Sequence, residues 1–179
     1  MKLLKFVPLF AIVACSSGPP AAPKIDYSQQ DIEYIAKYQE ASGGNYKIGK
    51  PYEINDDWYF PAQEPSYDKE GIASWYGTGL EGKRTANGET FRAADYTAAM
   101  PTLPMPSIVE VTNLDNGLKV NVRVNDRGPF HSKRIIDVSK AAAKALGMLQ
   151  NGTAHVRVKM LERETLEFMQ YSPKQYADE

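Results

Sequence analysis

Alternation of apolar and polar residues marks several β-strands in the second half of the chain. From Lys119 to Asn125 every second residue is a valine, and the residues between the valines are polar. This period of two predicts a strand with one buried face. Similar segments predict strands over 71–76, 96–99, 108–113, 134–138 and 153–160. So many short strands within about 90 residues favour a small closed β-barrel over 71–161.

Turn and cap residues separate these predicted elements. The turn Asp115-Asn116-Gly117 is typical of a hairpin, because its Asn-Gly pair tolerates positive φ. Ser139 is a candidate N-cap for a helix over 140–146, which Gly147 would close. The domain is therefore expected to be mainly β, with one short helix.

The valine strand leads into a carboxylate. Continued by one residue, the same alternation places Asp126 on the valine side, next to a Gly128-Pro129 turn. A buried charge is costly unless it is paired, so this position suggests chemistry. The alternative is that Asp126 caps the turn or pairs with Arg127, and the spacing alone slightly favours this alternative.

The N-terminus has the pattern of an export signal. Lys2 and Lys5 precede an apolar run over 6–14 that is too short to span a bilayer. The segment 12–15 resembles the bacterial lipobox, in which the cysteine is lipidated. We therefore expect a lipoprotein signal peptide over 1–14 and a flexible tether over 15–30 behind a lipidated Cys15. The alternative is an ordinary signal peptide followed by a spare thiol.

Such a lipid would anchor the exported protein to the cell membrane, facing the periplasm. The serine that follows Cys15 is compatible with passage to the outer membrane in a cell that has one.

Two further segments flank the predicted barrel. We interpret 31–70 as a short helix over 31–39 followed by an extended arm rich in aromatic residues and prolines. The arm is expected to wrap the barrel, because its aromatic side chains need a surface on which to pack. A glycan-stacking surface is the alternative. The C-terminal tail over 162–179 is charged and aromatic, helical at best, and receives no function.

Composition excludes several classes of function. The 179 residues contain 21 Lys and Arg against 22 Asp and Glu, so no excess of basic residues suggests nucleic acid as a partner. Two histidines and one cysteine are too few for a typical structural zinc site, and no metal or cofactor is expected. The 11 tyrosines and 2 tryptophans favour instead a polar, aromatic surface of the kind that binds sugars.

Several stretches, in order along the chain, resemble one known family. They are Gly-Ile-Ala-Ser-Trp-Tyr-Gly at 71–77, Thr-Ala-Asn-Gly-Glu at 85–89, Val-Thr-Asn-Leu at 111–114, Val-Asn-Asp-Arg-Gly-Pro-Phe at 124–130 and Arg-Ile-Ile-Asp-Val-Ser at 134–139. Together they are similar to the rare lipoprotein A (RlpA) family. The resemblance implies a six-stranded double-psi β-barrel, related to the barrels of expansins. It also implies a lytic transglycosylase that cuts peptidoglycan strands, in some members preferring denuded glycan without stem peptides.

The resemblance also assigns site residues. The functional acidic positions of the family fall on Glu89 and Asp126, and a family histidine falls on Met100. Methionine can neither hold a carboxylate by a hydrogen bond nor exchange a proton. In a lytic transglycosylase one carboxyl group can act first as acid and then as base. We expect Asp126 in that role and Glu89 as the stabiliser of positive charge or the orienter of substrate, with the two roles exchangeable.

Four further residues are candidates for substrate binding. Trp75 and Tyr76 are predicted either to stack on a sugar face or to belong to the core, and the pattern does not separate these readings. Arg127 is expected to bind the lactyl carboxylate of MurNAc or to pair with Asp137, and Asn125 belongs to the same motif. We interpret Asp137, which lies between apolar residues, as structural.

Three functions remain open at this point. The first is a lipid-anchored transglycosylase acting on peptidoglycan glycan strands in cell-wall remodelling and division, favoured by the intact motif around Asp126. The second is a module that binds or loosens wall glycan without cutting it, favoured by Met100. The third is a structural lipoprotein whose aromatic arm recruits a cell-division protein.

Overall fold

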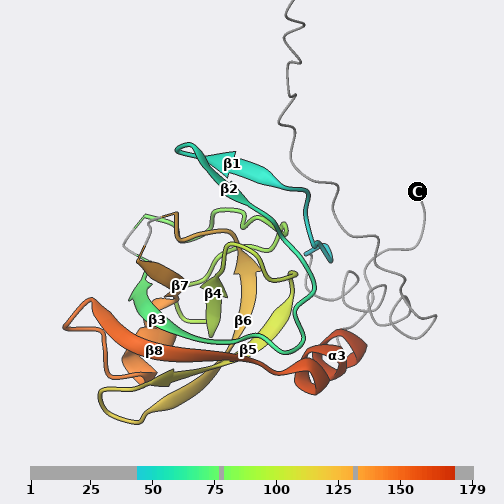
Figure 1. The fold of residues 1–179 in the computed structure, drawn as a ribbon. Helices are drawn as coiled ribbons and strands as arrows, with labels where there is room; N and C mark the ends of the chain where they lie inside the picture. The colour runs from blue at the N-terminus through green and yellow to red at the C-terminus, as the bar shows by residue number, and fades with distance from the viewer. Residues whose placement is uncertain (1–43, 77–78, 131–132, 172–179) are drawn as a thin grey trace, which may run out of the picture.

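The computed structural model describes residues 44–76, 79–130 and 133–171 (Figure 1). The predicted signal peptide, the tether with Cys15 and the helix over 31–39 lie outside these residues. None of the helices in the described part of the chain is long and apolar enough to cross a membrane.

Six strands close into a barrel in the order β3-β7-β4-β6-β5-β8, and β8 returns to pair with β3 (Figure 1). They are β3 (Asp68–Trp75), β4 (Thr97–Ala99), β5 (Ser107–Asn113), β6 (Lys119–Asp126), β7 (Arg134–Val138) and β8 (Thr153–Met160). The pairs β3–β7 and β4–β6 are parallel, and the other neighbours are antiparallel. The predicted six-stranded closed barrel is confirmed, although its first strand begins at Asp68 rather than at residue 71.

Period-two alternation determines which side chains fill the barrel. Along β8, Ala154, Val156 and Val158 are buried while the residues between them are exposed. Along β6, Val122 and Val124 are buried in the same core. The predicted strands over 119–125 and 153–160 therefore bury the faces that their sequence pattern indicates.

One short helix, α2 (Lys140–Ala145), packs on this core. Its N-cap is Ser139, whose hydroxyl oxygen accepts a hydrogen bond from the backbone N–H of Ala142 at 3.3 Å. Leu146 is the C-cap, and Gly147 follows in the left-handed region with φ +67°, which favours glycine. The predicted helix is confirmed, with its end one residue earlier.

A β-bulge near the end of β6 changes the face on which Asp126 lies. Ala98 pairs with Val124, but the next residue, Ala99, pairs with Asp126, so Asn125 is skipped. Paired residues point to the same side of a sheet, and Ala99 lies on the face opposite to its neighbour Ala98, which belongs to the hydrophobic core. Asp126 therefore lies on the outer face of the barrel, and the predicted orientation on the valine side is wrong. Re-aiming a side chain in this way is typical of bulges.

A second bulge, in β7, lies against a glycine of β3. Ile72 pairs with Arg134 and Ala73 with Ile136, so Ile135 is skipped. The side chain of Ile135 covers Gly71: a Cβ atom at Gly71 would lie 2.7 Å from Cγ2 of Ile135. Nothing larger than hydrogen fits there unless the isoleucine moves.

Gly71→Ala is therefore expected to lower the free energy of unfolding by about 1–3 kcal/mol, because the added methyl group overpacks the contact. Denaturant unfolding of the full chain measures the loss. Combining it with Ile135→Ala, which removes the atoms in contact, should cost less than the sum of the two single changes. Strictly additive losses would contradict a steric origin.

The arm that precedes β3 runs along the loop between β4 and β5. Lys47 and Met105 form a two-sided backbone bridge, with N···O distances of 2.7 and 2.8 Å. Farther along, the N–H of Ala62 donates to the carbonyl of Thr102 at 3.1 Å. Backbone hydrogen bonds thus fasten the arm to the barrel at these points, near residues 47 and 62.

Between these points the arm folds into a hairpin that the sequence pattern does not predict. Its strands are β1 (Tyr52–Ile54) and β2 (Asp57–Tyr59). Asn55 and Asp56 form the turn with φ values of 53° and 66°, as in the type I′ turns of two-residue hairpins. Trp58 and Phe60 are exposed, and their rings stack at 6.3 Å. The alternative role of the arm as a glycan-stacking surface stays a prediction.

The tail continues as helix α3 (Glu162–Tyr171), which packs against β5. The hydroxyl of Thr165 accepts a hydrogen bond from the backbone N–H of Ile108 at 2.9 Å. The guanidinium of Arg123 on β6 lies 5.1 Å from the ring centroid of Phe168, a cation–π contact. The first part of the predicted tail is therefore a fixed part of the domain.

Candidate active site

Residues from four neighbouring strands form a row across the outer face of the barrel. Ser74 pairs with Asp137, Asp137 with Ala99, and Ala99 with Asp126. Neighbouring strands are about 4.8 Å apart, so the Cα atoms of the two aspartates are separated by roughly 10 Å. Ala99 contributes only a methyl group between the two carboxylates.

The carboxylate of Asp126 is fixed by backbone donors. Its Oδ1 atom accepts hydrogen bonds from the N–H groups of Ala86, at 2.9 Å, and Arg127, at 2.8 Å. Burial raises the pKa of this carboxyl above its usual range, and the two N–H donors and the Arg127 charge oppose that rise. Asp126 is therefore held in one position and keeps its proton to higher pH than a free aspartate, which suits a proton donor.

This raised pKa predicts a pH dependence of stability. The folded chain holds the proton more tightly than the unfolded chain, where the pKa is about 3.9. The stabilising contribution is complete below that value and is lost as pH rises through the folded-state pKa. Asp126→Asn removes the titration, so the melting temperature of the variant minus that of the parent should grow as pH rises through this window. A difference that stays constant or shrinks would contradict the raised pKa.

Tyr76 lies close to both aspartates of the row. Its hydroxyl is buried and has no hydrogen-bond partner among the described residues. Burial, followed by the negative charges of Asp126 and Asp137, raises the pKa of Tyr76 far above its usual value, so the hydroxyl stays protonated. Its ring packs edge-on against Phe91 with centroids 5.1 Å apart. Trp75, by contrast, is half-buried against the core.

Asp137 is tied to its neighbours on the row. Its Oδ1 atom accepts a hydrogen bond from the hydroxyl of Ser74 at 2.7 Å and lies 3.3 Å from Nη1 of Arg134. The guanidinium of Arg134 also donates to Ser74. The predicted alternative pairing of Arg127 with Asp137 is thus replaced by a pairing with Arg134. The sequence indicated no site role for Asp137, because strand pairing is what brings it to Asp126.

The carboxylate of Glu89 is occupied by protein donors. Glu89 is only 3% exposed, and Nη2 of Arg123 lies 2.8 Å from its Oε2 atom. The side-chain amides of Asn87 and Asn125 donate to its two oxygens at 3.0 and 2.9 Å. Asn125, a predicted substrate-binding residue, is itself only 1% exposed, so in this structure its amide holds Glu89.

A tight turn connects Glu89 to Asp126. The N–H of Thr85 donates to the carbonyl of Glu89 at 2.8 Å, and Gly88 between them has φ +96°, which favours glycine. Ala86 of the same turn is the residue whose N–H holds Asp126. Arg123 and Asn125, which hold Glu89, share a face of β6, and the bulge brings Asp126 to that face. The structure thus brings the two predicted acidic residues together.

The guanidinium of Arg127 fastens the arm to the barrel. It donates to the carbonyl of Leu103 at 2.6 Å, to that of Met100 at 3.3 Å and to that of Ile48 on the arm. Binding of a lactyl carboxylate by Arg127 stays a prediction.

Met100, the residue on which the motif resemblance places the family histidine, belongs to the core. Its side chain is fully buried in the hydrophobic cluster. Its backbone N–H donates to the carbonyl of Asp126 at 3.1 Å. In this chain the position therefore supports the backbone of Asp126 and presents no side chain to it.

A groove lies between the arm and the loop that follows β6. We call this space, of about 680 Å³, the arm groove. Among the residues that line it are Lys47, Lys50, Pro51 and Tyr52 of the arm, and Arg127 and Phe130 of the loop.

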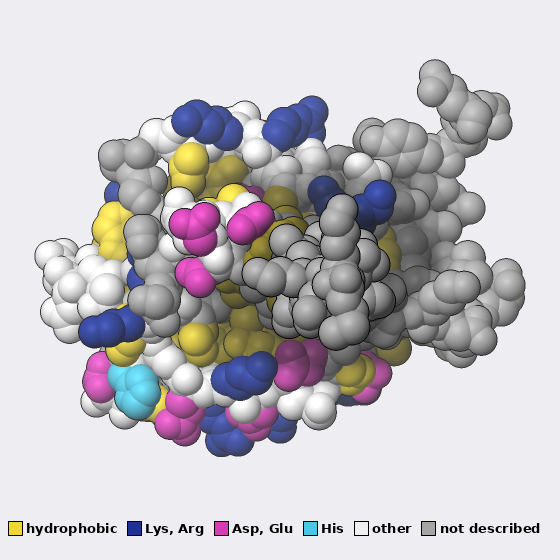
Figure 2. All heavy atoms as spheres, turned by 45° about the horizontal axis from the view of Figure 1, so that its top comes forward, with side chains coloured by type: hydrophobic (Ala, Val, Ile, Leu, Met, Phe, Trp, Pro, Cys, Tyr) yellow, Lys and Arg dark blue, Asp and Glu magenta, His cyan; other side chains and the backbone are white. Residues whose placement is uncertain are grey.

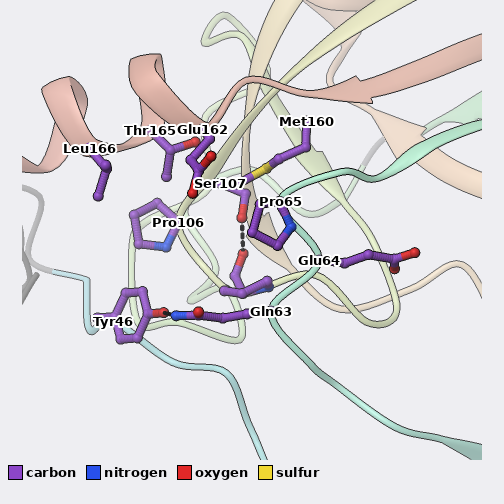
Figure 3. A pocket seen from close by; sticks show the side chains of 11 residues that line it. Tyr46, Gln63, Glu64, Pro65, Pro106, Ser107, Met160, Glu162, Thr165 and Leu166 are labelled. Atoms are coloured by element: carbon purple, nitrogen blue, oxygen red, sulfur yellow. Dashed lines mark hydrogen bonds between the residues drawn. The ribbon is translucent and has the colours of Figure 1, made fainter. Parts of the chain in front are cut away.

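A second, smaller cavity of about 140 Å³ lies where the arm and α3 approach the barrel (Figure 3). In the close-up, Tyr46 and Gln63 of the arm lie beside each other, and Leu166 projects from α3. The Gln63 amide donates to the Tyr46 hydroxyl at 3.2 Å, and Ser107 donates to the carbonyl of Pro104 at 2.6 Å. None of the predicted site residues lines this cavity.

Figure 2 shows acidic and basic side chains interspersed with apolar ones over the face that it presents. Such mixing agrees with a formal net charge of −1. Within the described residues, no three His, Cys, Asp or Glu side chains gather as ligands for a metal ion.

Comparison with known proteins shows the family to which this chain belongs. Residues 68–158 match the family model described as lytic transglycolase. A Rickettsia felis protein named endolytic peptidoglycan transglycosylase RlpA is 38% identical over 170 residues, which cover 93% of this chain and 75% of the relative. The chain belongs to the RlpA family. The resemblance read from the motifs is confirmed, and with it the double-psi β-barrel.

Two other relatives named endolytic peptidoglycan transglycosylase RlpA show how much of their length the chain covers. The RlpA of Campylobacter jejuni is 49% identical over 126 residues, which cover 70% of this chain and 46% of the relative. The RlpA of Pseudomonas aeruginosa strain UCBPP-PA14 is 54% identical over 113 residues, which cover 63% of this chain and 33% of the relative. The chain thus spans less than half the length of these two RlpA proteins.

Solved structures resemble the RlpA-family barrel in fold alone. The Streptomyces papain inhibitor matches with a TM-score of 0.46 at 24% identity, covering 56% of this chain and 100% of the inhibitor. The apo expansin of Clavibacter michiganensis matches with a TM-score of 0.44 at 19% identity, covering 54% of this chain and 51% of the expansin.

Proposed function

We propose that this RlpA-family chain is a lytic transglycosylase that cleaves the MurNAc–GlcNAc β-1,4 bond of peptidoglycan and leaves 1,6-anhydro ends. The observation that carries the proposal is the state of the carboxyl group of Asp126. Two backbone N–H groups hold it in place, and burial raises its pKa. The names of the relatives, which include a peptidoglycan substrate, support it.

One carboxyl group suffices for this reaction. Protonated Asp126 gives its proton to the glycosidic oxygen as the bond from C1 of MurNAc to that oxygen breaks. The C6 hydroxyl of the same MurNAc then attacks C1, and the carboxylate of Asp126 takes the hydroxyl proton. The new bond joins O6 to C1, and the acid is restored. No water is consumed, in contrast to glycoside hydrolysis, which usually needs a second carboxylate.

The other two carboxylates take different roles in this proposal. Glu89 is buried and paired with Arg123, so it acts through the turn that holds Asp126 rather than on the substrate. Asp137 lies in the same row as Asp126 and is less enclosed than Glu89. It is therefore the better candidate to stabilise positive charge at C1 of the breaking sugar.

Product analysis tests the proposal. The full chain is incubated with purified sacculi, and soluble fragments are analysed by mass spectrometry. A transglycosylase yields anhydro ends, whereas a hydrolase using both Asp126 and Asp137 would yield ends heavier by one water molecule. Fragments that carry only hydrated ends would refute the transglycosylase and indicate the hydrolase.

A non-catalytic module that binds or loosens wall glycan is the second candidate function. The buried Met100 favours it, because the family histidine has no counterpart at this position. In the same experiment such a module would pellet with sacculi and release no fragments.

The lipid anchor and the location belong to the proposal as well. The lipobox-like segment ending at Cys15 supports a lipoprotein tethered to the membrane and facing the peptidoglycan. Labelled palmitate should be incorporated into the parent but not into a Cys15→Ser variant. The preference for denuded glycan and contact with cell-division proteins stay predictions.

A further inference from the structure

We propose that the arm groove binds carboxylate groups carried by the glycan strand, next to the bond that Asp126 cleaves. This inference rests on the proposed function, because it concerns the same substrate. It gives the groove a ligand chemistry and gives Lys47 and Lys50 a role in recognition.

The charge of the arm groove is one-sided. Lys47, Lys50 and Arg127 line it, and no aspartate or glutamate is among its described lining residues. The whole chain, by contrast, has a formal net charge of −1. Lys47 and Lys50 are exposed residues, whereas the guanidinium of Arg127 donates hydrogen bonds to three backbone carbonyls. The lysine ammonium groups are thus the cations available to an anionic ligand.

Aromatic side chains form a fixed wall of the groove. The hydroxyl of Tyr52 donates to the carbonyl of Pro101 at 2.7 Å, and its ring stacks on Tyr59 with centroids 5.2 Å apart. Phe130 meets the rings of Tyr52 and Tyr59 edge-on at 6.0 and 5.5 Å. A wall held in this way loses little conformational entropy when a ligand binds. Aromatic rings beside cations suit a sugar that carries an acid group.

Lys47 connects the groove to the candidate catalytic residue. Its ammonium nitrogen lies 3.5 Å from the carbonyl oxygen of Ala86. The N–H of the same alanine donates to the carboxylate of Asp126. Ala86 therefore contacts both Lys47, at one end of the groove, and the carboxylate of Asp126.

The substrate offers carboxylates from two sources. A MurNAc residue without its stem peptide has a free lactyl carboxylate, and a MurNAc residue that keeps the peptide carries the carboxylates of that peptide. Both place an anion beside a β-1,4-linked backbone, and a lysine ammonium donates charge-assisted hydrogen bonds to either. Chitooligosaccharides have the same linkage and no carboxylate, so they separate backbone binding from carboxylate binding.

Binding is measured on the full chain carrying Asp126→Asn, so that no probe is consumed. The probes are amidase-treated glycan strands, strands with intact stem peptides, and chitooligosaccharides. Adding Lys47→Gln and Lys50→Gln should weaken binding of at least one carboxylate-bearing probe by roughly 10–100-fold, the range of lost charged hydrogen bonds. Affinity for chitooligosaccharides should stay within about two-fold. Restoring the charge with arginine at both positions should recover most of the affinity.

A matched control removes two exposed lysines elsewhere, by Lys140→Gln and Lys159→Gln, and should leave all affinities unchanged. A loss confined to amidase-treated strands assigns the groove to the lactyl carboxylate, and a loss on intact strands assigns it to the stem peptide. Equal loss on chitooligosaccharides, or no loss on any probe, would overturn the proposal. Since no catalysis is measured, the groove proposal can hold even if sacculi yield no anhydro ends.

Discussion

Asp126→Asn is expected to lower the rate of 1,6-anhydro end formation by about 10²–10⁴-fold, the usual contribution of a positioned acid/base. Asparagine has nearly the shape of aspartic acid, and its carbonyl oxygen can still accept from the N–H groups of Ala86 and Arg127. What it lacks is a proton to give to the leaving oxygen and a basic oxygen to receive one. The fold and the affinity for glycan should therefore survive.

The measurement compares anhydro fragments released from sacculi by equal amounts of parent and variant. Asp115→Asn is the matched control, because it is the same substitution at an exposed aspartate in the turn between β5 and β6. The control should pellet with sacculi and melt at the same temperature as the parent. It should also release fragments at the parent rate. If Asp126→Asn keeps the parent rate, another group donates the proton and the proposed mechanism fails.

Glu89→Gln is expected to have the largest effect on stability, about 2–4 kcal/mol, because it leaves Arg123 without its counter-ion. The side chain of Arg123 is 23% exposed, which keeps the loss below that of a fully buried pair. Arg123, Asn87 and Asn125 all donate hydrogen bonds to the carboxylate of Glu89. In a glutamine the NH2 group would replace one of the two acceptor oxygens, so at least one of these donors would face another donor. Denaturant unfolding of the full chain measures the loss.

A double-mutant cycle with Arg123→Met separates structure from catalysis. If the two residues act as a pair, the combined variant should be more stable than the sum of the single losses predicts. A role of Glu89 in positioning Asp126 predicts in addition that the pH profile of the residual activity shifts, because the Ala86 amide moves. Complete loss of activity with unchanged stability and an unchanged pH profile would instead indicate that Glu89 acts on the substrate directly.

Local sequence patterns were enough to predict much of the barrel. The valines of β6 and β8 face the core as their alternation indicates, and Ser139 caps α2. These features depend on the intrinsic geometry of one strand or one helix end. They are decided within a few residues, so a single sequence contains them.

The arrangement of the site depends on contacts between strands, and there the sequence was insufficient. Skipping Asn125 in the pairing of β4 with β6 reverses the face of Asp126, and no residue pattern announces that bulge. Asp137 joins Asp126 only because both strands flank Ala99. The burial of Glu89 depends on Arg123, a residue that alternation places simply on a polar face. Motifs identified the acidic residues, and tertiary pairing determined what each can do.

The strand order of the barrel has a consequence for how the domain is assembled. β3 is the first strand of the barrel, yet its two neighbours are β7 and β8, the last two strands of the barrel along the sequence. Such distant pairings slow folding, because the chain must close long loops before the contacts form. A chain emerging from the ribosome therefore has no barrel partner for β3 until β7 has been synthesised, and the barrel cannot close before β8. The barrel should consequently stay unfolded until its last strand has been synthesised. Truncation within β8 should leave both β3 and β5 as unpaired edge strands, which favour aggregation.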